Sequence, residues 1–212
     1  MYYSVITSAW LLHRQPSSPI YINEYTNDTR YELSIIEPDG EAVTRSFRID
    51  KAWDKALTEL AERIGISTSG LLEKIVRDYL LFYRWVEELE SVIFSPNTIK
   101  EVIDTLSDEQ LKAIAEKVAK ITFEESYLTR GDELTLETVK FQITQQMGKY
   151  AHWFSVDEHD TNSHYFYIKH RLGEKWSIFV EAYLSSLIQK IGNVHVITER
   201  DGENILIRLE YR

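Results

Sequence analysis

The sequence between Asp50 and Glu90 consists of two amphipathic helical patterns separated by the short turn GISTSG. Asp50 is a suitable N-cap for the first helix, and Gly65 is placed to end it. The second pattern continues from Leu71 to about Glu90, with Ser67 or Ser69 at the position of its N-cap. The apolar residues of the first pattern recur at helical spacing and are Trp53, Leu57, Leu60 and Ile64. A helical hairpin with a hydroxyl-rich turn is therefore the feature that most limits what this chain can fold into.

A short alternating segment, TRSFRI, stands directly before this hairpin. Side chains of a strand alternate between its two faces, so Phe47 and Ile49 share one face. The opposite face carries Thr44, Ser46 and Arg48. Arginine can make a bidentate pair with guanine in the major groove of DNA, and serine and threonine can bond to several base edges. We take these three residues as candidate base contacts.

The order of strand, capping residue, helix, Gly-x-Ser-x-Ser turn and second helix resembles the ribbon-helix-helix family of DNA-binding regulators, over about residues 44–80. The resemblance implies that two chains pair their strands antiparallel, that this ribbon enters the major groove, and that the second helix holds a phosphate at its amino terminus. A homodimer would double the base readers to six and would bury the apolar stripes of both chains. At the start of the second helix, Ser67, Thr68 and Ser69 offer N–H groups and hydroxyls to a DNA phosphate.

Charge alone does not favour DNA binding. The chain has a formal net charge of -10, which argues against non-specific coating of nucleic acid. From Thr44 to Glu90, eight Lys and Arg stand against nine Asp and Glu, which leaves a charge of -1. A local cluster can still make the ribbon face positive, and it consists of Arg45, Arg48, Lys51 and Lys55. Any DNA contact is therefore expected to be local.

Residues 1–43 are expected to form an irregular arm in which a β-hairpin can occur. Prolines, polar residues and the lack of a sustained period characterise residues 1–30. The runs YELSII and EAVTRSFRI flank the turn EPDG, where proline and glycine favour a chain reversal. If both runs pair, the ribbon becomes wider than the major groove comfortably accepts. This hairpin and insertion into the groove are therefore alternatives.

Residues 96–212 are expected to form an α+β effector or assembly domain, after a boundary near Ser91 to Pro96. Helical patterns cover 98–106, 107–126 and 135–150, and the second opens with a capping box of Ser107 and Gln110. Two antiparallel pairs of strands are expected, one at 151–172 and one at 193–211, with an amphipathic helix over 174–192 between them. The prediction is an α+β fold in which helices pack on a four-stranded antiparallel sheet.

A histidine-rich stretch in this domain offers a metal site as an alternative. Imidazole and carboxylate suit nickel or zinc, but the spacing matches no known ligand pattern. His164 and His170 are expected on one strand face, and His159 and Asp160 in the turn. Exposed polar residues of a strand and a turn explain the stretch without a metal, and we assign no metal and no cofactor. The candidate ligands are His152, Asp157, Glu158, His159, Asp160, His164 and His170.

The aromatic residues of this domain are compatible with a pocket for a small-molecule effector between sheet and helix, although such residues more often form the hydrophobic core. They are Trp153, Phe154, Tyr165, Phe166, Tyr167, Trp176, Phe179 and Tyr183. Gly173 can present its amide to an anion, or it can simply end a strand. No pair of acids lies in an apolar frame beside an evident base or nucleophile, so we do not expect an enzyme.

The chain contains no cysteine, which excludes disulfides and thiolate metal sites. It has no run of about 18 apolar residues and no signal-peptide pattern, so a cytoplasmic protein without membrane contact is expected. The sequence as a whole predicts a dimeric, sequence-specific DNA-binding transcriptional regulator whose C-terminal domain senses a ligand or mediates assembly. Its expected partners are double-stranded DNA and a second copy of itself. The alternative is a protein-interaction or assembly module that keeps the dimeric fold without binding DNA.

Overall fold

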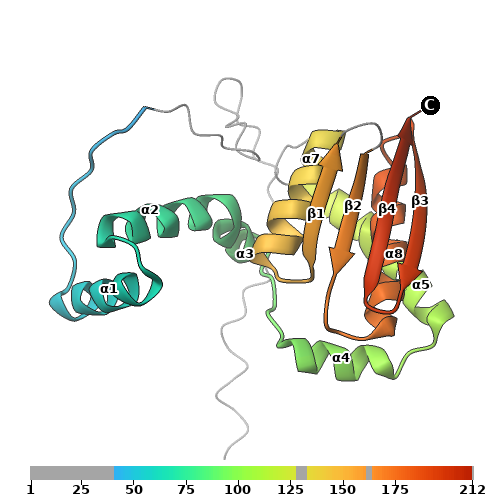
Figure 1. Cartoon of the computed structure of the whole chain (residues 1–212), viewed down its shortest axis with the longest axis horizontal. Coiled ribbons are helices and arrows are strands. Elements are labelled where there is room, and N and C mark those ends of the chain that lie inside the picture. The colour runs from blue at the N-terminus through green and yellow to red at the C-terminus, as the bar shows by residue number, and fades with distance from the viewer. Residues whose placement is uncertain (1–40, 128–132, 161–163, 212) are drawn as a thin grey trace, which may run out of the picture. The chain divides into compact units, whose positions relative to one another are not determined.

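The computed structural model describes residues 41–127, 133–160 and 164–211. Over these residues the chain combines helices with one four-stranded antiparallel sheet, which confirms the α+β class (Figure 1). The run YELSII and most of the expected arm lie outside the described residues. All described residues belong to one compact unit, and the boundary expected near Ser91 to Pro96 stays a prediction.

The helical hairpin forms where its caps predict it, as α1 (Lys51–Ile64) and α2 (Thr68–Asp78). The Asp50 carboxylate accepts the N–H of Ala52 at 2.8 Å. Gly65 ends α1 in the left-handed region with φ 76°, which glycine adopts without the steric cost that a Cβ would bring. The Ser67 hydroxyl accepts the N–H of Gly70 at 3.0 Å, so Ser67 and not Ser69 caps α2.

The second helix continues to the expected end through a π-helical turn, η1 (Tyr79–Tyr83), and α3 (Arg84–Glu88). It stops at Glu90, a non-glycine residue with φ 48°. The N–H of Ser91 donates to the carbonyl of Val86 at 2.9 Å, and the N–H of Glu90 donates to that of Glu87 at 3.1 Å. These bonds close the helix in the way a Schellman motif does and fix the direction in which the chain leaves it.

The expected helices of the C-terminal half are all present. They are α4 (Pro96–Asp104), α5 (Asp108–Thr122), α7 (Leu136–Phe141) and α8 (Glu174–Gln189), with π-helical segments η2 (Phe123–Tyr127) and η3 (Gln142–Tyr150) continuing α5 and α7. The capping box of α5 is confirmed: the N–H of Gln110 donates to the Ser107 hydroxyl at 3.3 Å, and the N–H of Ser107 donates to the Gln110 side chain at 2.8 Å.

The sheet consists of β1 (Ser155–Asp160), β2 (His164–Lys169), β3 (Val194–Asp201) and β4 (Asn204–Tyr211), in the order β1-β2-β4-β3. Both expected hairpins are confirmed, and β2 pairs with β4 to join them. The placement of His159 and Asp160 in the turn was wrong. Both lie in β1, opposite Tyr165 and His164, because the ladder continues further than the polar sequence suggests.

The core lies between one face of the sheet and the helices. Helix α8 packs on β3 and β4, α5 packs on α8, and η3 packs beside β1 (Figure 1). The buried inner face of the sheet comprises Phe166, Ile168, Val194, Val196, Ile205, Ile207 and Leu209. Strand alternation sends Tyr165, Tyr167, Leu206 and Arg208 to the other face, where they stay partly exposed. Within the described ranges, no helix has both the length and the apolar character to cross a bilayer.

Candidate nucleic-acid interface

The expected base-reading segment is exposed along its whole length. Residues 41–50 belong to no helix or strand, and each of them is exposed. Thr44, Ser46 and Arg48 are thus accessible, but so are Phe47 at 65% and Ile49 at 38%. A strand needs a neighbour to satisfy its backbone groups. Among the described residues Thr44 to Ile49 have no such neighbour, so pairing of this segment across a dimer stays a prediction.

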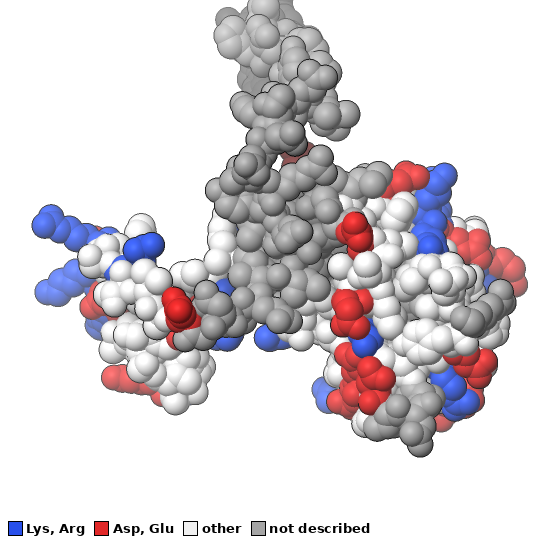
Figure 2. All heavy atoms as spheres, turned by 90° about the horizontal axis from the view of Figure 1, so that it is seen from above, with Lys and Arg blue, Asp and Glu red and all other residues white. Residues whose placement is uncertain are grey.

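Basic side chains surround the start of α1. Arg45, Arg48, Lys51 and Lys55 are all exposed, and Figure 2 shows Lys and Arg side chains projecting from the region of α1 beside acidic ones. Lys55 lies 3.7 Å from Glu59, an exposed pair of small energetic weight. The remaining basic groups are available to a partner of negative charge.

The start of α2 retains free N–H groups. Ser67 uses its hydroxyl for the N–H of Gly70, and the Leu71 N–H donates to the Ser67 carbonyl at 2.9 Å. Within the described chain, no hydrogen bond is made by the backbone N–H groups of Thr68 and Ser69. These two amides point out of a helix amino terminus, where the helix dipole favours an anion. The expected phosphate contact therefore depends on the amides of Thr68 and Ser69 more than on the Ser67 hydroxyl.

The helical hairpin leaves most of its apolar surface uncovered. From residue 50 to residue 78, Ala61 and Leu71 are the only described apolar residues that are buried. The exposed large apolar side chains of this region extend beyond α2 and are Trp53, Leu60, Ile64, Ile66, Ile75, Val76, Tyr79, Leu80 and Tyr83. Monomeric proteins rarely expose contiguous apolar patches larger than a few hundred Å². The exposed apolar side chains of the hairpin are therefore a candidate contact surface.

A buried carboxylate anchors α2 to the C-terminal half, and the sequence analysis missed it. Asp78 is 7% exposed and forms ion pairs with Lys74 and, at 3.7 Å, with Arg77. The Tyr150 hydroxyl at the end of η3 lies 3.4 Å from Asp78, and the Tyr150 ring stacks on Phe82 with centroids 5.3 Å apart. A sequence signal existed, because Leu71, Asp78 and Trp85 are seven residues apart and share one helical face. All three are buried.

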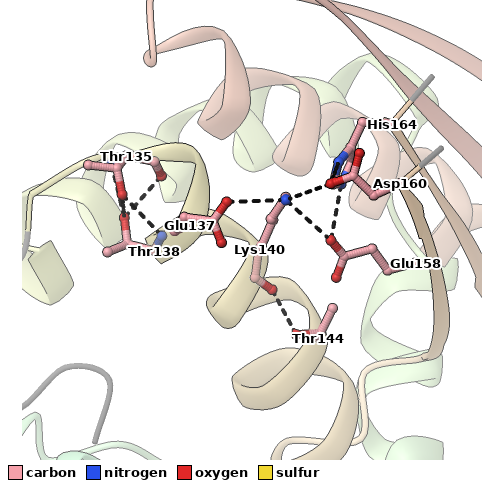
Figure 3. A network of polar contacts seen from close by, with 8 residues as sticks. All are labelled: Thr135, Glu137, Thr138, Lys140, Thr144, Glu158, Asp160 and His164. Atoms are coloured by element: carbon pink, nitrogen blue, oxygen red, sulfur yellow. Dashed lines mark hydrogen bonds and ion pairs between the residues drawn. The ribbon is translucent and has the colours of Figure 1, made fainter. Parts of the chain in front are cut away.

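Lys140 of α7 is the centre of a second polar network (Figure 3). Its Nζ lies 3.2 Å from Glu137, 3.6 Å from Glu158 and 3.3 Å from Asp160, and its side chain is only 14% exposed. Burial alone would lower the pKa of Lys140, but hydrogen bonds to Glu137 and Asp160 raise it above its ordinary value. The hydrogen bond from Lys140 also lowers the pKa of Asp160. Three carboxylates from one helix and one strand thus surround a single ammonium.

His164 lies buried between two of these carboxylates. Its Nε2 is 3.2 Å from Glu158, and its Nδ1 is 3.3 Å from Asp160. The two carboxylates therefore flank different nitrogens of the ring, an arrangement that does not converge on one ion. Within the described residues, no group of three or more His, Cys, Asp and Glu is placed to hold a metal. The interpretation of this stretch as exposed polar residues was wrong for His164 and His170, because both side chains are buried.

His170 and Ser177 form a buried pair in which Nε2 and Oγ are 2.8 Å apart. The N–H of Leu172 donates to Nδ1 at 3.3 Å, and the Ser177 hydroxyl donates to the Gly202 carbonyl at 2.6 Å. This network assigns the hydrogen to Nε2, which donates to Ser177. A serine nucleophile requires a hydrogen bond in the other direction, from the serine hydroxyl to an unprotonated imidazole nitrogen. The pair therefore serves to hold β2, α8 and the β3–β4 turn together.

The aromatic residues divide between core and surface. Trp153, Trp176, Phe179 and Tyr183 contact one another with ring centroids 5.2–6.2 Å apart, and they belong to the hydrophobic core with Phe154 and Phe166. The Gly173 amide donates to the Glu203 carboxylate at 2.9 Å. The amide at the start of α8 is therefore already bonded to the Glu203 carboxylate of the same chain.

Comparison with protein-family models, curated proteins and solved structures finds no match for this chain.

Proposed function

We propose that this protein is a dimeric, sequence-specific DNA-binding transcriptional regulator. Two chains pair residues 44–49 as an antiparallel ribbon, and Thr44, Ser46 and Arg48 of each chain meet base edges in the major groove. Thr68 and Ser69 hold a phosphate and set the register of the ribbon. A cytoplasmic location belongs to the same proposal, because the operator DNA has to be reachable.

The observation that carries the proposal is the uncovered apolar face of residues 47–83. Phe47, Trp53 and Tyr79 are 65%, 68% and 45% exposed. Burial of apolar area at about 25 cal/mol per Å² is the main favourable term in association. A second copy would cover the apolar face of the hairpin and would also give residues 44–49 a strand to pair with. Formation of one two-fold symmetric dimer thus accounts for both exposed features.

The C-terminal α+β half acts as the ligand-sensing or assembly part of this regulator. It has a buried core of its own, and the contacts of Tyr150 with Asp78 and Phe82 connect it to α2. A change in packing around Tyr150 would therefore alter the helix that contacts phosphate.

A gel-retardation assay with the DNA upstream of the protein's own coding sequence tests the proposal. The full-length chain is expected to retard this DNA, and Arg48→Ala is expected to weaken binding at least about fivefold, since a bidentate arginine–guanine pair contributes about 1–3 kcal/mol. Arg171→Ala, at an exposed position of the C-terminal half, is the charge-matched control and should bind like the natural chain.

The net charge of -10 favours a second candidate, a protein-interaction or assembly module that keeps the dimer without DNA binding. The same assay separates the two. Absence of retardation for both the natural chain and Arg48→Ala, with a dimer in solution, would support the second candidate.

A further inference from the structure

Three consecutive apolar side chains stand exposed directly after the helical hairpin. Val92, Ile93 and Phe94 are 73%, 77% and 56% exposed, between the end of α3 and the start of α4. Such runs are uncommon on a folded surface and usually mark a contact site. In an extended chain, successive side chains point in opposite directions, so Ile93 needs cover on a different side from Val92 and Phe94.

The position of this segment is set by the helix that precedes it. Glu90 adopts the left-handed region, and the Ser91 N–H is bonded to the Val86 carbonyl. A left-handed non-glycine residue costs roughly 1–2 kcal/mol, so the reversal is held by its surroundings. Val92 to Phe94 therefore leave the helix in a fixed direction.

The same helix presents an apolar stripe that leads toward this segment. Its residues recur every four positions and are Ile75, Val76, Tyr79, Leu80 and Tyr83, at 37–57% exposure. A four-residue repeat drifts around an α-helix of 3.6 residues per turn, and the wider turn of η1 corrects that drift. A neighbouring face of the helix is already used, because Asp78 and Phe82 contact Tyr150. The stripe is thus the face left for a partner.

We infer that a second copy of this chain covers the segment Val92–Phe94 together with this stripe, so that the dimer contact extends past the hairpin to residue 94. This inference rests on the proposed dimer. In the proposed dimer a second copy covers the hairpin, and the stripe continues from α2 into η1. Aromatic side chains present about 150–250 Å² each, and a standard interface takes about 800 Å² from each partner. Phe47, Trp53, Tyr79, Tyr83 and Phe94 are 45–68% exposed, which at that size amounts to roughly 400–700 Å² before the aliphatic side chains are added.

Thiol accessibility tests the inference cleanly, because the chain contains no cysteine. Val76→Cys reports on α2, and Val92→Cys reports on the segment. Both are nearly isosteric changes at exposed positions of 57% and 73%. Glu116→Cys, at an exposed position on α5, is the control. The rate of maleimide modification is measured in the full-length chain over a wide range of protein concentration.

The inference predicts that Val76→Cys and Val92→Cys both react about tenfold more slowly at high than at low concentration, because mass action shifts the chain into the dimer. Glu116→Cys should react rapidly throughout. Slowing of Val76→Cys alone would overturn the inference and leave the proposed dimer intact. Reaction of both thiols as fast as that of Glu116→Cys at every concentration would overturn both. Slowing of Val92→Cys alone, or protection of Val92→Cys in a chain that sedimentation shows to be a monomer, would also overturn the inference, since the contact would then not continue from the hairpin or would lie within one chain.

Discussion

The imidazole of His170 is buried beside Ser177, and burial lowers its pKa below the ordinary 6.5, against a smaller opposing effect of Glu203. As the pH falls below about 6.5, the unfolded chain takes up a proton that the folded chain resists. The free energy of unfolding should therefore decrease as the pH falls from 6.5 toward the folded pKa, and this term should be absent above 6.5.

Urea denaturation between about pH 5 and pH 8 measures this dependence. His170→Gln should show a shallower loss of stability on the acid side than the natural chain. Lys169→Gln changes the exposed neighbour and should keep the natural slope. If the free energy of unfolding of His170→Gln fell with decreasing pH as steeply as that of the natural chain, a group other than His170 would be responsible for the loss of stability below pH 6.5.

Single residues also show where sequence reasoning succeeds. Asp50, Gly65, Ser107 and Gln110 were predicted from local rules, because a cap is satisfied within three or four residues. The buried positions of His164 and His170 were not predicted. Which face of β2 turns inward depends on how the sheet meets α8, and that is decided by residues distant in sequence.

At the scale of elements, the start of α2 has a structural role and a proposed role in phosphate contact. Ser67→Ala should lower the free energy of unfolding by about 1 kcal/mol, because it removes the N-cap. Ser69→Ala should change it by less than about 0.5 kcal/mol. If the Ser69 hydroxyl contacts phosphate beside its amide, Ser69→Ala should still weaken DNA binding, whereas a contact through the amide alone would be kept. Urea denaturation and a DNA titration of both variants check this, and an equal loss of stability in both would contradict the assignment of the cap.

The junction of α7 with β1 and β2 is expected to depend on Lys140. Lys140→Met keeps the apolar stem but leaves Glu137, Glu158 and Asp160 without their shared cation. A loss of about 1–2 kcal/mol is expected, because Lys140 is buried while two of its partners are exposed, so the value should lie between that of an exposed ion pair and that of a buried charged hydrogen bond. Lys149→Met, at an exposed position of η3, is the control for chemical denaturation. Equal stability of the two variants would show that the network contributes little.

The elements themselves followed from the sequence, but their contacts did not. Each expected helix and strand pair of residues 96–212 is present, because period, caps and turn residues are local signals. The π-helical segments and the Lys140 network had no such signal. Glu158, Asp160 and His164 meet only because of the register between β1 and β2, and Lys140 reaches them only because α7 packs there.

At the scale of the whole molecule, the two halves differ in how they cover their apolar residues. The α+β half buries a continuous core from α4 to β4. The hairpin of α1 and α2 keeps large apolar side chains exposed, and so does the segment before it. A second copy that covers them also places two sets of Thr44, Ser46 and Arg48 side by side. Dimer formation and DNA recognition are thus one event in this account.

The most direct test is to select bound sequences from a pool of random DNA duplexes. The account predicts enrichment of a two-fold symmetric site. Arg48→Ala should lose the preference at one position in each half-site, whereas Arg45→Ala, on the other face of the segment, should keep the same site with weaker binding to all sequences. Enrichment of no site, of an asymmetric site, or of a site that Arg48→Ala leaves unchanged would contradict it.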